Sequence, residues 1–189
     1  MSSGFTELLE ANPVIAAVKS EEGLAHCCEL EEIRIVFVLY GTICDVAEIV
    51  KRIKDSGKIA MVHVDLVAGL AGRDVAVQFI RRHTEADGII STKPTLIAEA
   101  KKQGLYTVLR VFLLDSMAYQ NLDREVRMCR PDCVEVLPGL MPKVIRRIRE
   151  KNRLPLIAGG LISDREDVMS ALDAGAISVS STNQAVWDL

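Results

Sequence analysis

The sequence is poor in aromatic residues and carries no excess of positive charge. Aromatic residues make up 4% of the 189 positions, and the formal net charge is -3. Because proteins hold nucleic acid mainly through cationic side chains on its phosphates, the charge of the whole chain does not favour such binding. A nucleic-acid contact would therefore require a local basic patch.

Long apolar runs are also absent. The longest uncharged apolar stretch, 35–44, is far shorter than the about 20 residues that span a bilayer, which excludes a membrane span. The first residues contain no apolar core of a secretion signal, and the cysteine count of five is odd, with no second pair or nearby histidine to complete a metal site. We expect a reduced, cytoplasmic protein that has no metal and no cofactor.

The apolar residues that are present fall into eight short runs. Each run is too short for a helix, is rich in valine and isoleucine, and is nearly continuous, as in strands buried on both faces of a parallel sheet. The runs are 14–18, 35–39, 59–64, 88–90, 107–113, 133–136, 156–158 and 177–180.

Stretches with helical spacing of apolar residues separate these runs. They include 45–56, 94–103, 141–151 and 163–174, and the last opens with Ser163 and Glu166 at the spacing of a capping box. The sequence therefore predicts an α/β fold, a compact (β/α)8 TIM-like barrel formed as a single domain over residues 1–189. Because typical barrels have about 250 residues, some helices must be short or missing, above all after the eighth strand. An open doubly wound sheet is the alternative, but the glycine-rich first turn of that fold is lacking.

Two glycines and a group of hydroxyls follow the last two predicted strands. In barrels, phosphate commonly binds at the loops after strands seven and eight. Gly159 and Gly160 let the backbone approach a ligand closely, and Ser180 and Ser181 offer hydroxyls near no carboxylate of their own loop. These four residues are the candidate phosphate-binding residues, and ordinary turn chemistry is the alternative explanation.

Polar side chains at the ends of the other strands would surround the rest of the ligand. Each could be structural alone, but a convergent set of acids and cations suits a small polyol phosphate. The same groups could perform acid–base chemistry on a sugar phosphate. The candidates for this ligand pocket are Lys19, His63, Asp65, Lys93, Arg110 and Glu135.

One helix-like stretch carries a local cluster of positive charge. Such a run is usually a solvated face, and RNA contact is the functional alternative. The RNA-binding candidates are Lys143, Arg146, Arg147 and Arg149, and Lys151 and Arg153 extend the cluster.

The ordered series of strand-end motifs resembles the glycerol-3-phosphate-responsive antiterminator family over nearly the whole chain. The motifs are VHVDL at 62–66, DGIISTK at 87–93, RVFLLDS at 110–116, EVLPG at 135–139 and AGGLI at 158–162. The resemblance implies a barrel-like regulator, without catalytic residues, that senses glycerol 3-phosphate and binds the leader mRNA of glycerol-uptake genes to prevent premature termination. It also implies that Gly160, Ser180 and Ser181 hold the phosphate, with the pocket candidates around the rest of the ligand.

Two other functions remain consistent with the residues. The first is a barrel enzyme, an isomerase, aldolase or phosphodiesterase acting on a small sugar or polyol phosphate, with Asp65 or Glu135 as base and Lys93 as electrophile. The second is a ligand-binding protein that acts through protein partners. Self-association into a homo-oligomer is left open.

Overall fold

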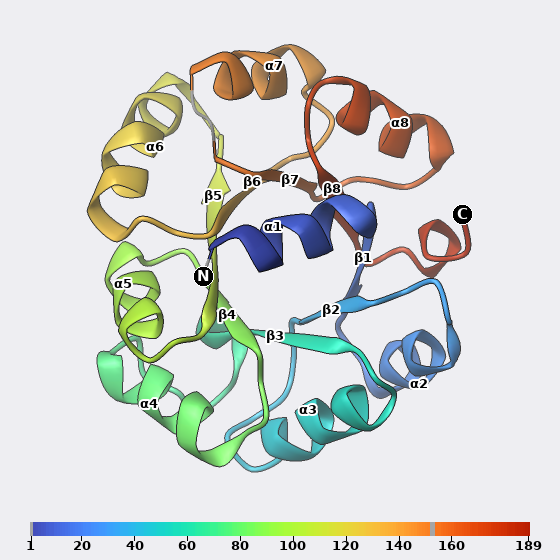
Figure 1. Cartoon of the computed structure of the whole chain (residues 1–189), viewed down its shortest axis with the longest axis vertical. Helices are drawn as coiled ribbons and strands as arrows, with labels where there is room; N and C mark the ends of the chain where they lie inside the picture. The colour runs from blue at the N-terminus through green and yellow to red at the C-terminus, as the bar shows by residue number, and fades with distance from the viewer. Residues whose placement is uncertain (1, 152–153) are drawn as a thin grey trace.

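Eight parallel strands form a closed barrel in which each strand pairs with the next and β8 pairs with β1 (Figure 1). The computed structural model describes residues 2–151 and 154–189, so Arg153 of the basic cluster lies outside the described residues. The strands are β1 (Val14–Val18), β2 (Ile35–Val38), β3 (Ile59–His63), β4 (Gly88–Ser91), β5 (Tyr106–Phe112), β6 (Cys133–Leu137), β7 (Leu156–Gly159) and β8 (Ser178–Ser181). The predicted barrel is confirmed, and the predicted strand bounds agree to within one residue.

Helices of 9 to 14 residues surround the barrel and connect its strands (Figure 1). The α-helices are α1 (Ser2–Ala11), α2 (Glu21–Glu29), α3 (Val46–Asp55), α4 (Asp74–His83), α5 (Pro94–Lys102), α6 (Ser116–Cys129), α7 (Pro142–Lys151) and α8 (Arg165–Asp173). Two 3-10 helices are η1 (Val64–Leu66) and η2 (Gln184–Val186). Within the described part of the chain only η2 follows β8, so the final unit lacks a full helix, as predicted.

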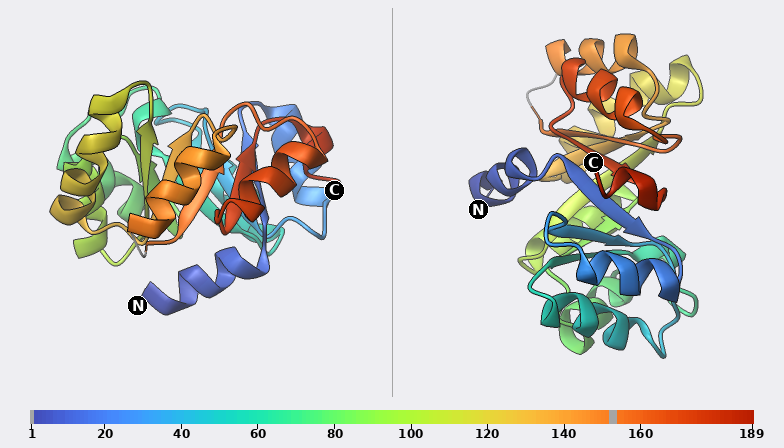
Figure 2. Two further views of the ribbon diagram at one scale, coloured as in Figure 1. Left: turned by 90° about the horizontal axis from the view of Figure 1, so that it is seen from above. Right: turned by 90° about the vertical axis from the view of Figure 1, so that its right-hand side faces the viewer.

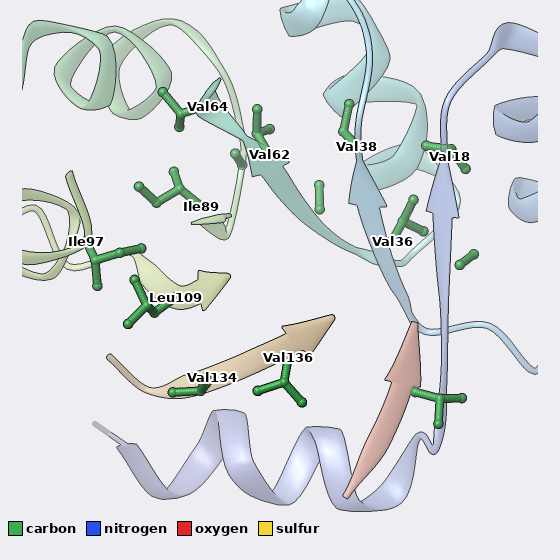
Figure 3. Packing of buried hydrophobic residues seen from close by; sticks show 14 of the residues in the cluster. Val18, Val36, Val38, Val62, Val64, Ile89, Ile97, Leu109, Val134 and Val136 are labelled. Carbon is green, nitrogen blue, oxygen red and sulfur yellow. The ribbon is translucent and has the colours of Figure 1, made fainter. Parts of the chain in front are cut away.

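Alternation along the strands creates two apolar layers. Side chains such as Val36, Val62 and Val136 belong to the outer layer, which packs between the strands and the helices, and Figure 3 shows part of it. Phe37 and Met61 belong to the inner layer, which fills the barrel interior. Successive side chains of a strand point to opposite faces. The residues that reach the barrel mouth are therefore those that continue the inward-facing positions at the carboxyl end of each strand.

Helix α1 covers the end of the barrel opposite that mouth, and Figures 1 and 2 show it lying across the strands. The side chains of Phe5 and Leu9 are fully buried, and the Phe5 ring stacks on Tyr106 with 4.5 Å between ring centroids. The Ser178 hydroxyl donates a hydrogen bond of 2.8 Å to the Leu9 carbonyl. This helix was not predicted from the sequence, and it leaves the carboxyl ends of the strands as the open face.

The predicted capping box of the last long helix is wrong by one position. Asp164, not Ser163, is the N-cap of α8, and its carboxylate accepts a hydrogen bond of 2.9 Å from the Asp167 amide. The Asp167 carboxylate in turn accepts 2.9 Å and 2.8 Å hydrogen bonds from the backbone and hydroxyl of Ser163. An aspartate satisfies the first amides of a helix as well as a serine does, so either residue could have served. No helix in the described parts of the chain is long and apolar enough to cross a membrane.

We expect Phe5→Ala to lower the free energy of unfolding by about 3 to 5 kcal/mol, because it deletes a fully buried ring from the closed end of the barrel. Glu7→Ala, at an exposed position of the same helix, should change it by less than about 0.5 kcal/mol. Chemical denaturation with far-ultraviolet circular dichroism measures both. Equal, small effects of the two substitutions would mean that α1 does not pack on the barrel in solution.

Candidate functional site

A cavity of about 360 Å³ opens at the carboxyl ends of the strands. It lies mainly among the ends of β5 to β8, where barrels place their functional residues. Its lining comprises Ala17, Leu39, Arg110, Glu135, Leu137, Gly160, Leu161, Ile162, Ser163, Ser180, Ser181 and Thr182. The structure therefore brings together five of the ten residues predicted for the phosphate and ligand sites, and places a sixth, Gly159, directly behind them.

A buried ion pair forms the floor of this cavity. Arg110 and Glu135 are register partners on β5 and β6, and the Arg110 Nε donates a 2.5 Å hydrogen bond to the Glu135 carboxylate. The other carboxylate oxygen of Glu135 accepts a 2.5 Å hydrogen bond from the Ser180 hydroxyl. Glu135 is fully buried, and a buried carboxylate requires such partners for both of its oxygens.

Gly159 is needed for this packing. A Cβ atom at this position would lie 2.5 Å from the Glu135 carboxylate and 2.6 Å from the Ser180 hydroxyl. The sequence predicts that the backbone at Gly159 lies close to a ligand. In the structure, the groups close to it are the side chains of Glu135 and Ser180. The next residue, Gly160, has φ of +74°, which a side chain would disfavour, and it lines the cavity.

The loop after β7 continues in an unusual backbone conformation. Leu161 has φ of +63°, although it is not a glycine, and its side chain is 71% exposed. Two successive residues with positive φ turn the chain sharply as it leaves the strand. Such strain persists where the surrounding structure imposes it, commonly at binding sites.

Ser181 lines the cavity, and its hydroxyl is also bonded within the protein. Its hydroxyl donates a 2.7 Å hydrogen bond to the Ile162 carbonyl and accepts one of 3.0 Å from the Asn183 amide. The Asn183 side chain also donates to the Ser163 carbonyl at 2.9 Å. Ser181 thus ties the loop after β8 to the loop after β7, so its contribution to the cavity is to hold its walls together.

Two hydroxyls of the cavity lining were missed as site candidates. Thr182 follows β8 and lines the cavity together with Ser163 of the neighbouring loop. The sequence could have indicated Thr182, because side chains two positions apart along a strand point to the same side, as Ser180 and Thr182 do. Ser181 also lines the cavity, but its hydroxyl is directed to the Ile162 carbonyl.

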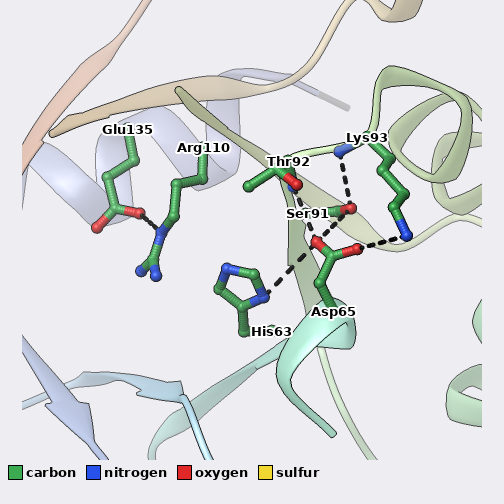
Figure 4. Close-up of polar contacts among 7 residues, drawn as sticks. All are labelled: His63, Asp65, Ser91, Thr92, Lys93, Arg110 and Glu135. Carbon is green, nitrogen blue, oxygen red and sulfur yellow. Dashed lines mark hydrogen bonds and ion pairs between the residues drawn. The ribbon is translucent and has the colours of Figure 1, made fainter. Parts of the chain in front are cut away.

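A second polar cluster lies next to the cavity, on the other side of Arg110 (Figure 4). The Asp65 carboxylate accepts hydrogen bonds from the Ser91 hydroxyl at 2.8 Å and the Thr92 amide at 2.9 Å. One Asp65 oxygen lies 3.5 Å from the Lys93 ammonium, and the other lies 3.7 Å from Nδ1 of His63. His63 and Asp65, two of the candidates for the ligand pocket, therefore lie side by side, and Lys93 joins them.

Burial, hydrogen bonds and neighbouring charges determine the protonation of this cluster. Burial and the positive charge of Arg110 lower the pKa of His63 from 6.5 to about 4, although Asp65 opposes the change. Burial disfavours the Asp65 carboxylate, but the hydrogen bonds from Thr92 and Ser91 outweigh it and lower the pKa of Asp65 below its usual value. At neutral pH the cluster contains a neutral imidazole beside a carboxylate.

The remaining candidates lie apart from the cavity. Lys19 is exposed just beyond the end of β1 and does not line the cavity. Of the four RNA-binding candidates, Lys143, Arg146 and Arg147 are exposed on α7. Arg149 is half-buried and donates a 2.5 Å hydrogen bond to the Leu154 carbonyl, so its charge is partly used within the fold. Among the described residues, no group of three histidine, cysteine or acidic side chains is arranged to hold a metal ion.

The fold and the site together define a (β/α)8 barrel with a small pocket of apolar and polar residues at its mouth, the end at which barrels carry their functional residues. The family of glycerol-3-phosphate responsive antiterminators matches residues 14–187, and the chain belongs to this family. The predicted resemblance is confirmed.

Individual relatives are similar over almost their whole lengths. The uncharacterized protein YgcP of Escherichia coli (strain K12) is 47% identical over 182 residues, which cover 96% of this chain and 95% of that protein. The crystal structure of the glycerol uptake operon antiterminator regulatory protein from Listeria monocytogenes is 32% identical, with a TM-score of 0.89 and coverage of 93% and 94%. A glycerol uptake operon antiterminator-related protein from Thermotoga maritima is also 32% identical, with a TM-score of 0.83 and coverage of 94% and 99%.

The pKa of His63 predicts a pH dependence of stability. Between pH 6.5 and about 4, the unfolded chain takes up a proton at His63 that the folded protein does not. The free energy of unfolding should therefore fall by about 3 kcal/mol from this residue as the pH is lowered through that range. Unfolding by urea at several pH values measures this decrease.

The His63→Gln variant should lose that part of the pH dependence. His83→Gln, at an exposed position on α4, should keep the profile of the unmodified protein. Parallel profiles for the unmodified protein and His63→Gln would show that burial of His63 is not linked to protonation.

Proposed function

We propose that this protein is a non-enzymatic regulator that binds glycerol 3-phosphate in the barrel mouth and the leader mRNA of glycerol-uptake genes at its surface. The observation that carries the proposal is the orientation of Arg110. Its Nε is bonded to Glu135, while its two terminal nitrogens point away from Glu135 and bond no other described residue (Figure 4). A guanidinium held in this way presents free N–H donors to an anion in the cavity.

The cavity and the polar cluster beside it together offer complementary groups to both parts of this ligand. Arg110, the backbone of Gly160 and Leu161, and the Thr182 hydroxyl would hold the phosphate. His63 and Asp65, on the far side of Arg110, would accept hydrogen bonds from the glycerol hydroxyls. A cavity of about 360 Å³ is of a size suited to a small ligand.

The same contacts favour a regulator over an enzyme. Both oxygens of Glu135 are engaged by Arg110 and Ser180, so this carboxylate is poorly placed to act as a base. The Lys93 side chain is 49% exposed and lies 3.5 Å from Asp65, whereas an electrophilic lysine requires a desolvated site. These contacts support the assignment of binding rather than turnover.

Ligand binding can be tested by thermal melting with glycerol 3-phosphate, glycerol and inorganic phosphate. At 100 times the dissociation constant, a ligand adds about 2.7 kcal/mol of stability, which raises the melting temperature of a chain of this size by about 5 to 10 °C. We expect this shift with glycerol 3-phosphate and a much smaller one with the other two compounds.

A triple variant provides the matched control. Arg110→Met, Glu135→Leu and Ser180→Ala together remove every partner of the buried network, so no charge is left unpaired and the fold should persist. This variant should melt cooperatively and show no shift with glycerol 3-phosphate. An equal shift in the variant and the unmodified protein would place the ligand elsewhere.

The proposed RNA surface is the exposed face of α7. Lys143, Arg146 and Arg147 are three and four positions apart, so they lie on one side of the helix. Beside them, a groove of about 410 Å³ between α6 and α7 is lined by residues that include Tyr119 and Arg147. An aromatic ring and a guanidinium in one groove are suited to stack an unpaired base, and the neighbouring cations to hold phosphates.

The path from ligand to RNA is short. Leu137 at the end of β6 lines the ligand cavity, and α7 begins at Pro142 only a few residues later. A ligand that moves the loop between them would re-aim the basic face, which gives the two states that linked binding requires. Because leader mRNA is transcribed there, the proposal also places the protein in the cytoplasm.

We expect the double substitution of Arg146 and Arg147 by alanine to weaken binding of a glycerol-operon leader RNA. The slope of log affinity against log salt concentration should decrease in magnitude by about 1 to 2, because two phosphate contacts are lost. Arg82→Ala on α4, elsewhere around the barrel, should leave affinity and slope unchanged. A larger effect of Arg82→Ala than of the double substitution would move the RNA surface to α4.

A further inference from the structure

His63 lies between a group that only accepts hydrogen bonds and a group that only donates them. Its Nδ1 faces the Asp65 carboxylate at 3.7 Å, and its other nitrogen, Nε2, is turned towards the guanidinium of Arg110 (Figure 4). The side chain is 3% exposed, so both neighbours act on it without much screening by water. Nδ1 is buried and has no hydrogen-bond partner at normal length among the described residues.

These neighbours determine which nitrogen carries the proton. A carboxylate has no proton to donate, so the nitrogen that faces it is stabilised as N–H. A guanidinium has only N–H donors, so the nitrogen that faces it is stabilised as a bare lone pair. The imidazole is neutral at neutral pH because burial and Arg110 lower its pKa to about 4. His63 therefore has its proton on Nδ1 and an unprotonated Nε2.

The carboxylate that sets this tautomer is itself fixed. Asp65 Oδ2, the oxygen facing His63, accepts hydrogen bonds from the Ser91 hydroxyl and the Thr92 amide. Lys93 lies 3.5 Å from the other oxygen. Two donors hold Oδ2, and the hydrogen bonds lower the pKa of the carboxyl group, so Asp65 stays ionised with this oxygen towards His63. Nε2 is therefore held as an acceptor on the side of the cluster that faces Arg110 and the neighbouring cavity.

We propose that His63 is a specificity-determining residue, which selects a ligand that carries a hydroxyl over the corresponding ligand that carries a carbonyl. This inference rests on the proposed function, because it assumes that a three-carbon phosphate occupies the barrel mouth. A hydroxyl donates a hydrogen bond to Nε2, whereas a carbonyl oxygen at the same place has no proton to donate, so its lone pair repels that of Nε2. The pocket then distinguishes the polyol phosphate from its oxidised, ketonic form.

The affinity for each ligand tests this selection directly. Isothermal titration calorimetry of the unmodified protein should give a dissociation constant about 10- to 100-fold lower for glycerol 3-phosphate than for dihydroxyacetone phosphate, the range expected when one buried group is left unpaired. In His63→Gln the ratio should fall to within about 3-fold, because a carboxamide can rotate to donate or to accept.

Gly160→Ala is the matched control within the same pocket. Gly160 has φ of +74°, and an added Cβ would lie 3.1 Å from the Leu137 side chain, so the substitution disturbs the phosphate loop and leaves the neighbourhood of His63 unchanged. It should weaken both ligands by a similar factor and preserve their ratio. A ratio that collapsed equally in both variants would show that His63 holds the pocket together and does not select.

The tautomer can be read in the unmodified protein, so the test does not depend on folding of a variant. Long-range proton–nitrogen correlation spectra of protein labelled at histidine nitrogen should show His63 with a protonated Nδ1 and an unprotonated Nε2. The His63→Gln spectrum assigns the signals among the three histidines. A protonated Nε2 in the unmodified protein would overturn the proposal.

The outcomes separate this inference from the proposed function. If neither phosphate binds, the proposed function fails, and the selection fails with it. If both bind with equal affinity, the pocket and its ligand class stand, and the selection by His63 is wrong. Tight binding of glycerol 3-phosphate, weak binding of the ketone and loss of the difference in His63→Gln would support both.

Discussion

The ion pair between Arg110 and Glu135 is the interaction around which the barrel mouth is organised. A carboxylate that is fully buried among strands needs a partner for each oxygen, and Arg110 and Ser180 supply them from neighbouring parts of the barrel. The pair also excludes a side chain at position 159, since the space a Cβ would occupy is filled by Glu135 and Ser180. Through Arg110 it reaches His63, whose protonation depends on that positive charge. One buried pair thus joins the cavity to the cluster around Asp65.

The barrel could be predicted from the sequence because its signals are local. Continuous runs of branched apolar residues define strands buried on both faces, and helical stretches between them define parallel connections. Helix α1 was missed because nothing in its sequence shows what it covers. Phe5 and Leu9 are buried only against the closed barrel, through contacts with residues such as Tyr106 that are far away in the chain. Such burial depends on the closed barrel, which cannot be predicted from any short stretch of the sequence.

The sequence predicts which residues lie at the ends of the strands, but it does not predict the contacts among them. His63 and Asp65 lie at the end of the same predicted strand, but their contact depends on η1, which begins directly after β3 and brings Asp65 beside His63 and Lys93. The facing of Arg110 and Glu135 depends on the register between β5 and β6, which the sequence does not state. Ser181 lines the cavity as a strand-end residue, but the bonds of its hydroxyl to Ile162 and Asn183 depend on how the last two loops meet. Lys19 follows the end of the first strand, as the sequence predicts. Because β1 ends at Val18, the Lys19 side chain is exposed to solvent and does not line the cavity.

The closure of the barrel by α1 has a consequence for how quickly a bound molecule exchanges. Because that helix covers one end, a ligand in the cavity enters and leaves through the mouth, whose rim carries the exposed side chains of Leu161, Phe112 and Leu114. A macromolecule resting on this rim would obstruct arrival and departure alike. It would lengthen the residence time of the ligand without necessarily changing its equilibrium affinity. The time for which a ligand stays bound would then depend on what covers the opening of the barrel.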